Sequence, residues 1–142
     1  MKVTDSKYGQ CLYFTSAALA RKVEKLALDS WKEVDLPPSI AYLLMAVLEE
    51  PGIQPSALAA ELHLQPSTIT RLIQKLEEKK LAVRTSEGKI THVYPTPKAK
   101  ELLPRMKVCL QRFYQQYIQL LGEEESGRLV QDMGRLADKL GS

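Results

Sequence analysis

The stretch from Pro55 to Arg84 constrains the fold of this chain more than any other part of the sequence. Two segments of helical character follow one another there, each opened by a proline, and only the run His63-Leu64-Gln65 separates them. Proline suits the first position of a helix, because the N–H that it lacks would have no partner there. Two helices joined by a turn of three or four residues form a helix-turn-helix. The sequence therefore predicts this motif, with helices that begin near Pro55 and at Pro66.

The second of these helices is expected to run to about Lys80 and to have two contrasting faces. Apolar residues recur at helical spacing and predict one buried stripe: Ile69, Leu72, Ile73 and Leu76. The first turn instead carries hydroxyls, at Ser67, Thr68 and Thr70, directly before Arg71. These hydroxyls either serve only to start the helix or face a polar, negatively charged partner.

A β-hairpin is predicted directly after the second helix. Two runs of β-prone residues, Ala82 to Thr85 and Ile90 to Tyr94, flank Glu87-Gly88, where glycine can supply the positive φ of a tight turn. A helix-turn-helix followed by a hairpin is a winged helix. In the turn between the two helices, His63 occupies a place where glycine is common. We interpret it as a turn residue rather than a ligand.

Long helices are predicted on both sides of this module. The first is expected from Ser6 to Ser30 and a second from Ile40 to Glu49, after the break made by two prolines. Thr96 is a predicted N-cap for a helix from Pro97 to about Leu121, in which Pro104 should cause a kink or mark a later start. A last helix should follow Gly122, with glutamates in its first turn.

The predicted fold class is thus mainly α (α+β): a winged helix-turn-helix with long N- and C-terminal helices. These end helices offer more apolar surface than a small central module can cover. Because soluble monomers rarely leave large apolar patches bare, the end helices are expected to mediate oligomerisation.

Charge is unevenly distributed along the 142 residues, which suffice for one domain. The net charge of the whole chain is +3, but residues 65–100 alone hold eight basic and three acidic groups. A local basic excess is typical of a phosphate-binding surface, although it also fits a solvated charged face.

Several classes of protein are disfavoured by the sequence. No apolar run is long enough for a membrane span or a signal peptide, so a cytoplasmic protein is expected. The two cysteines, Cys11 and Cys109, have no CxxC spacing, and His63 and His92 lie too far apart in sequence to predict zinc. With no glycine-rich phosphate loop and no nucleophile beside an evident partner, we expect neither an enzyme nor a cofactor.

Nearly the whole chain resembles the MarR (multiple antibiotic resistance regulator) family of bacterial transcription factors. The resemblance rests on the run "SALAAELHLQPSTITRLIQKLEEKKLAVR", on the hairpin after it and on "TPKAKEL". Within the run, the leucine-alanine pair, the serine-threonine pair and the following threonine-arginine pair match the family pattern; these are Leu58-Ala59, Ser67-Thr68 and Thr70-Arg71.

The resemblance implies a homodimer that binds a pseudo-palindromic double-stranded DNA operator and acts as a repressor. Residues 37–96 would form the DNA-binding core, and residues 1–34 and 97–142 the dimerisation region of one MarR-like domain. The residues that would contact DNA are Ser67, Thr68, Thr70, Arg71, Gln74, Lys75, Lys79, Arg84 and Lys89. The alternative is a winged helix that mediates protein interaction or dimerisation and binds no specific DNA.

Two departures from the family pattern concern the end of the recognition helix and the wing. Lys80 stands where relatives usually have glycine, which predicts a less sharp helix end. The wing is short and lacks the usual aspartate, so its expected DNA contacts reduce to Arg84 at the base and Lys89 at the tip.

Members of the family usually respond to a small molecule or an oxidant. Aromatic and apolar residues that could line an effector site are Tyr13, Phe14, Trp31, Tyr42 and Met45, although such residues also fit plain core packing. The segment Gly9–Arg21 resembles the first helix of the peroxide-sensing branch, which makes Cys11 a candidate redox residue and Cys109 its candidate resolving partner. The other interpretation of Cys11 is a small buried hydrophobe.

Overall fold

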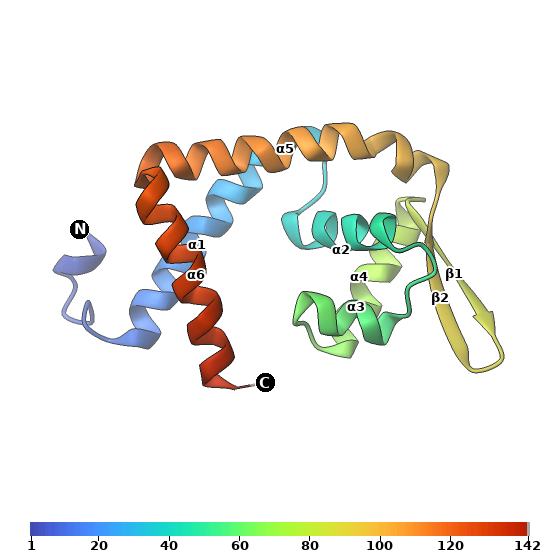
Figure 1. Cartoon of the computed structure of the whole chain (residues 1–142), viewed down its shortest axis with the longest axis horizontal. Coiled ribbons are helices and arrows are strands. Elements are labelled where there is room, and N and C mark those ends of the chain that lie inside the picture. Colours follow the sequence, from blue (N-terminus) through green and yellow to red (C-terminus); the bar gives the residue numbers. More distant parts are fainter. Residues whose placement is uncertain (142) are drawn as a thin grey trace. The chain divides into compact units, whose positions relative to one another are not determined.

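The computed structural model describes residues 1–141 and contains six α-helices and one hairpin in that range (Figure 1). In chain order the elements are α1 Leu12–Ser30, α2 Pro38–Glu49, α3 Pro55–Leu62, α4 Pro66–Glu78, β1 Ala82–Glu87, β2 Ile90–Pro95, α5 Pro97–Leu121 and α6 Glu123–Leu140. Short 3-10 turns lie at Val3–Asp5 and Lys32–Val34. The mainly α winged-helix fold predicted from the sequence is confirmed.

The chain divides into two compact units, and each is described by itself. The winged-helix unit comprises Trp31–Cys109, and the terminal-helix unit comprises Met1–Ser30 together with the chain from Leu110 onward. Helix α5 is continuous, so it begins in the winged-helix unit and ends in the terminal-helix unit. Pro104 lies inside it, and the helix continues through this residue, so Pro104 does not mark a later start.

The winged-helix unit is built around a closely packed apolar core. Its fully buried side chains come mainly from α2, α3, α4 and β2 and include Leu43, Leu44, Val47, Leu58, Ile69, Ile73, Leu76 and Val93; Trp31 and, from α5, Met106 and Cys109 are also fully buried. The predicted stripe of α4 is confirmed, since Ile69, Leu72, Ile73 and Leu76 are all buried. This core fixes the orientation of α4, because turning the helix would expose the stripe to water.

The wing is a two-stranded antiparallel sheet whose register places Glu87 opposite Ile90. The residues between the strands are therefore Gly88 and Lys89, one position later than the turn Glu87-Gly88 predicted from the sequence. Gly88 has φ +65°, the conformation that glycine adopts without steric cost. Beyond the hairpin, Ile53 forms an isolated antiparallel bridge with Val93.

That bridge anchors the α2–α3 connection to the wing. The Gly52 N–H donates to the Val93 carbonyl at 2.8 Å, and the Val93 N–H donates to the Ile53 carbonyl at 3.0 Å. His92 Nδ1 also lies 2.8 Å from the Gly52 carbonyl oxygen. The base of the hairpin is thus held by the helical module as well as by its own strand pairing.

Both helices of the helix-turn-helix end at a non-glycine residue in the left-handed region. His63 has φ +54° and closes α3, which confirms its expected turn role. Lys80 has φ +62°, its N–H donates to the Glu77 carbonyl, and the Leu81 N–H donates to the Leu76 carbonyl. This pair of bonds is a Schellman motif. Helix α4 therefore ends sharply despite the lysine, contrary to the sequence-based expectation.

The terminal-helix unit contains the first stretch of the chain, where the sequence prediction was wrong by six residues. Helix α1 begins at Leu12 and not at Ser6. The Ser6 hydroxyl accepts a hydrogen bond from the Tyr8 N–H, and the Gly9 N–H donates to the Ser6 carbonyl. Serine and glycine thus stabilise a local turn that competes with helix formation.

Few side chains of the terminal-helix unit are buried. In its described residues only Ala27, Ser30 and Ser126 are buried. The Ser30 hydroxyl lies 2.7 Å from Gln116 Oε1 and 3.0 Å from the Leu26 carbonyl oxygen. Large apolar side chains remain exposed on its helices, among them Leu19, Val23, Leu28, Tyr114, Leu120, Val130, Met133, Leu136 and Leu140.

Candidate nucleic-acid interface

Helix α4 presents a polar face opposite the stripe that holds it to the core. Ser67, Thr70, Arg71, Gln74 and Lys75 are exposed, while Thr68 and Lys79 are half-buried. The alternation follows from helical periodicity, since residues three and four apart share a face. The structure therefore brings the six α4 residues predicted to contact DNA, and Lys79 directly after the helix, to the side away from the core.

The hydroxyls of the first turn differ in what they bond. Thr70 Oγ1 donates to the Pro66 carbonyl at 3.0 Å, so its proton is used within the helix while its lone pairs stay available. Ser67 and Thr68 have no side-chain hydrogen bond within residues 1–141, and Gln65 makes no side-chain cap bond at the helix start. The first turn therefore leaves two hydroxyls able to bond an external group.

At the base of the wing, Arg84 is tied to α4 by Glu77. Arg84 Nη2 lies 2.7 Å from Glu77 Oε1, and the Arg84 N–H donates to Glu77 Oε2 at 3.3 Å. Both side chains are about one third exposed, so this is a partly screened ion pair. The sequence prediction missed Glu77, which reduces the positive charge that Arg84 offers to an anion.

The tip of the wing carries the other predicted wing residue. Lys89 is exposed in the turn between the strands, next to exposed Gly88 and Glu87. One positive and one negative side chain therefore stand at the tip. Because their charges offset each other, the wing tip offers an anion much less attraction than the face of α4.

Two residues at the start of α5 hold the end of α4, and the sequence prediction gave them no such role. Thr96 Oγ1 donates to the Lys80 carbonyl at 2.8 Å, and Lys98 Nζ donates to the Lys79 carbonyl at 3.1 Å. Thr96 also accepts a hydrogen bond from the Ala99 N–H, which confirms it as the N-cap of α5. A positive group at a helix C-terminus also complements the helix dipole.

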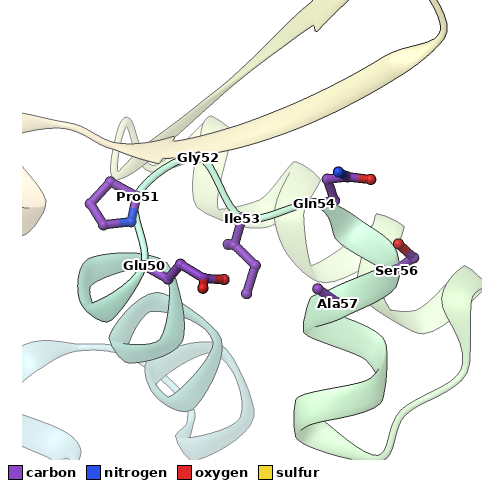
Figure 2. A pocket seen from close by; sticks show the side chains of 7 residues that line it. All are labelled: Glu50, Pro51, Gly52, Ile53, Gln54, Ser56 and Ala57. Atoms are coloured by element: carbon purple, nitrogen blue, oxygen red, sulfur yellow. The ribbon is translucent and has the colours of Figure 1, made fainter.

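A shallow pocket of about 460 Å³ lies along the α2–α3 connection, at the start of α3 (Figure 2). Glu50, Pro51, Gly52 and Ile53 form one side, and Gln54 and Ser56 lie at the helix start. Phosphate could accept hydrogen bonds at such a helix start, but the Glu50 carboxylate would repel it. We therefore do not include this pocket in the candidate interface.

The candidate effector residues fall in both units. Tyr13 is exposed and Phe14 half-buried in the terminal-helix unit. Trp31 and Tyr42, in the winged-helix unit, form an edge-to-face pair with ring centroids 6.1 Å apart. The Trp31 indole N–H is buried and has no acceptor in residues 1–141, and the side chain of Met45 is half-buried.

The two cysteines form no disulfide in residues 1–141, and their surroundings differ. Cys11 is exposed and lies directly before α1, while Cys109 is buried within α5. Exposure favours reaction with an oxidant, whereas burial limits it. The exposure of Cys11 also means that it is not the buried hydrophobe that the sequence left as its other interpretation.

The fold agrees with what sequence comparison finds. The sequence model of the MarR family matches residues 34–89, which span α2, α3, α4 and β1. This stretch of the chain is similar to the MarR family. The chain is 29% identical over 102 residues to a putative transcriptional regulatory protein for the hcr operon of Thauera aromatica, a match that covers 70% of this chain and 61% of that protein. The matched region thus spans about three fifths of that relative.

Solved structures of MarR-type regulators extend the similarity to nearly the whole chain. The transcriptional regulator SlyA superposes with a TM-score of 0.76 at 26% identity, covering 92% of this chain and 94% of SlyA. The repressor CouR superposes with a TM-score of 0.83 at 21% identity, covering 96% and 98%. These relatives are transcriptional regulators and not enzymes.

None of the helices in residues 1–141 combines the length and apolar character needed to cross a bilayer. No group of three or more His, Cys, Asp or Glu side chains in that range is arranged to hold a metal ion.

Proposed function

We propose that this chain is a MarR-family regulator: a homodimeric, sequence-specific DNA-binding repressor whose affinity for DNA responds to a small molecule or an oxidant. The observation that carries the proposal is the polar face of α4, fixed outward by a buried stripe on the opposite side. A helix of this kind fits the major groove, where the residues of its N-terminal turns reach base edges.

The residues of α4 divide by chemistry into two roles. The hydroxyls of Ser67 and Thr68, the guanidinium of Arg71 and the amide of Gln74 can read base edges, and arginine can bond guanine with two N–H groups. Lys75 and Lys79 would contact phosphates, which positions the helix without specifying sequence. Thr70 would contribute only as an acceptor, because its proton is held by Pro66.

The wing has a smaller part in this proposal. Glu77 neutralises Arg84 in part, and Glu87 stands beside Lys89 at the tip. We infer that Arg84 mainly holds the wing to α4 and that Lys89 supplies one phosphate contact. CouR, which has the same fold, was solved bound to a 23-mer DNA duplex, and this supports DNA as the partner here.

We place dimerisation in the terminal helices, residues 1–34 and 97–142. The terminal-helix unit exposes leucines, valines and tyrosines that a soluble protein would ordinarily cover. Between α1 and the end of α5 it also has a mainly apolar groove of about 490 Å³. The groove is lined by Leu19, Val23, Leu26, Tyr117, Leu120 and Leu121, together with Lys22, Lys25 and Asp29. A second copy of the chain would bury these surfaces and set the distance between two recognition helices.

An effector site and a redox response remain parts of the proposal. CouR was also solved with p-coumaroyl-CoA, which supports a small-molecule signal in this family. In this chain the unpartnered indole N–H of Trp31, beside Tyr42, can donate to a ligand. The exposed thiol of Cys11 can meet an oxidant, and Cys109 would have to become accessible before it could resolve the product.

Selection of binding sites from random DNA, followed by two matched variants, tests the function. Arg71→Ala should lose discrimination at one or two base pairs of the selected half-site, at a cost of about 1–3 kcal/mol. Lys75→Ala, on the next turn of the same exposed face, should weaken selected and random DNA by the same factor. If no sequence is enriched, or if both variants act alike on all DNA, α4 does not read bases, and a protein-interaction module is favoured instead.

A further inference from the structure

A small cavity of about 220 Å³ lies between the last turns of α5 and the first turns of α6, wholly inside the terminal-helix unit. Tyr114 and Tyr117 line it from α5, and Glu123, Ser126 and Val130 line it from α6. A water molecule takes about 30 Å³ of liquid volume, so the cavity has room for a guest of several heavy atoms. Tyr114 and Val130 of its lining also belong to the exposed apolar surface that a second copy would bury, but none of the roles proposed above uses Glu123 or Ser126.

Ser126 gives the first sign that the cavity takes a polar guest. Its side chain lines the cavity and is only 2% exposed, yet its hydroxyl has no hydrogen-bond partner within residues 1–141. Buried hydroxyls in folded proteins are almost always hydrogen-bonded. A guest that bonds this oxygen would satisfy it.

The two tyrosines supply a second feature. Their ring centroids lie 5.4 Å apart with an angle of 76° between the planes, and Phe113 packs against Tyr117 at 5.2 Å. This edge-to-face arrangement fixes the orientation of the rings on one side of the cavity. The face of an aromatic ring carries partial negative charge and attracts cations.

The charge of the α6 start agrees with a cationic guest. Glu123 lines the cavity, and no hydrogen bond or ion pair holds its carboxylate within residues 1–141. Glu124 and Glu125 follow in the same turn. The positive end of the α6 dipole amounts to about half a charge, so three carboxylates outweigh it.

We propose that this cavity binds a small primary ammonium ion. The carboxylate of Glu123 and the oxygen of Ser126 would each accept one N–H of the ammonium group, and Tyr114 and Tyr117 would pack against the carbon next to it. An ion with N–H donors is favoured over a quaternary one, because only N–H groups can satisfy the Ser126 hydroxyl oxygen. This site does not depend on DNA binding, and either proposal can fail without the other.

Binding is tested with n-butylammonium chloride, added to the full-length protein and followed by calorimetry and by amide NMR. We expect a dissociation constant in the ~millimolar range, as befits so few ligand atoms. The amide signals of Gly122 and Gly127, beside and within the cavity lining, should shift, while that of Gly88 in the wing should not. Tetramethylammonium, which has charge but no N–H, and 1-butanol, which has no charge, should bind at least ~5-fold more weakly.

Three variants separate a built site from general attraction to an acidic surface. Glu123→Gln should weaken n-butylammonium binding about tenfold, while Glu124→Gln, which removes the same charge one residue away, should change it less than about twofold. Ser126→Ala should reduce the preference for n-butylammonium over tetramethylammonium, because one of the two N–H acceptors is then lost. Equal effects of the two glutamate variants would overturn the proposal, as would equal binding of the two cations by the unmodified protein. It would also be overturned if the amine did not bind and Glu123→Gln instead weakened self-association, since a lysine of a second copy would then occupy the cavity.

Discussion

The two units of this chain differ in how much of their apolar surface they bury for themselves. In the winged-helix unit Leu43, Leu44, Leu58 and Ile73 are fully buried, and the wing is tied to the helices by the Ile53–Val93 bridge. In the terminal-helix unit large apolar side chains such as Leu28, Val130 and Leu136 stay about half exposed. The first unit buries its apolar side chains by its own packing, whereas the second leaves exposed the apolar surface that the proposed dimer would bury.

This contrast agrees with the proposed division of work. A DNA-binding protein needs a rigidly held recognition helix, and the core behind α4 supplies that rigidity. A surface that joins two copies needs apolar side chains that are exposed before assembly.

Removing a buried side chain from the core of the winged-helix unit should give the largest loss in the free energy of unfolding. Leu44→Ala deletes a fully buried leucine of α2 and should lower the free energy of unfolding by about 2–5 kcal/mol. The matched Leu136→Ala, at a residue 47% exposed in α6, should cost less than about 1 kcal/mol in dilute protein. Urea denaturation measures both, and similar losses would contradict the contrast between the units.

A charge placed on the apolar face of α6 should separate the proposed dimer. Met133→Glu puts a carboxylate where a second copy is expected, and should raise the dimer dissociation constant roughly 100-fold or more, because a buried unpaired charge is costly. Gln131→Glu adds the same charge on the opposite face of the helix and serves as the control. Sedimentation equilibrium distinguishes them, and a dimer unaffected by Met133→Glu would remove α6 from the interface.

Replacing Lys80, the residue with a left-handed backbone at the end of α4, should have a smaller effect and should stabilise the protein. Lys80→Gly should raise the free energy of unfolding by about 0.5–1 kcal/mol, since glycine adopts φ +62° without strain. Lys79→Gly, at a residue with φ −84°, should instead lower it. Thermal unfolding measures the two variants, and a loss of stability in Lys80→Gly would show that the lysine side chain itself stabilises this end.

The smallest effect is expected for the ion pair between α4 and the wing. A double-mutant cycle of Glu77→Ala and Arg84→Ala should give a coupling energy of up to about 1 kcal/mol, because both side chains are partly exposed. The same single variants separate the proposed roles on DNA. Arg84→Ala should weaken DNA binding less than Arg71→Ala does. The reverse order would show that Arg84 is a main DNA contact and not chiefly a link between the wing and α4.

Much of this fold could be predicted from sequence because its elements are marked locally. Prolines 55, 66 and 97 each open a helix where predicted, and Thr96 caps α5 as expected. The stripe of α4 follows from helical periodicity alone. The same local patterns led to the family resemblance, and so to the candidate contacts on α4.

What the sequence did not reveal depends on contacts between distant residues or on competing local bonds. The bridge between Ile53 and Val93 and the ion pair between Glu77 and Arg84 leave no periodic signal. The late start of α1 comes from the turn made by Ser6 and Gly9. The helical spacing of apolar residues further along the chain gave no sign of this turn. At Lys80, the Schellman bonds and the Thr96 hydroxyl stabilise a conformation that the side chain disfavours.

The salt dependence of binding to a selected DNA site tests the central claim most directly. If two copies of α4 lie in major grooves, with Lys75, Lys79 and Lys89 of each copy at phosphates, the logarithm of the association constant should fall steeply with the logarithm of salt concentration. The expected slope is about −5, from roughly six neutralised phosphates. A slope near zero would contradict the account, because a protein that contacts several phosphates must release counterions when it binds.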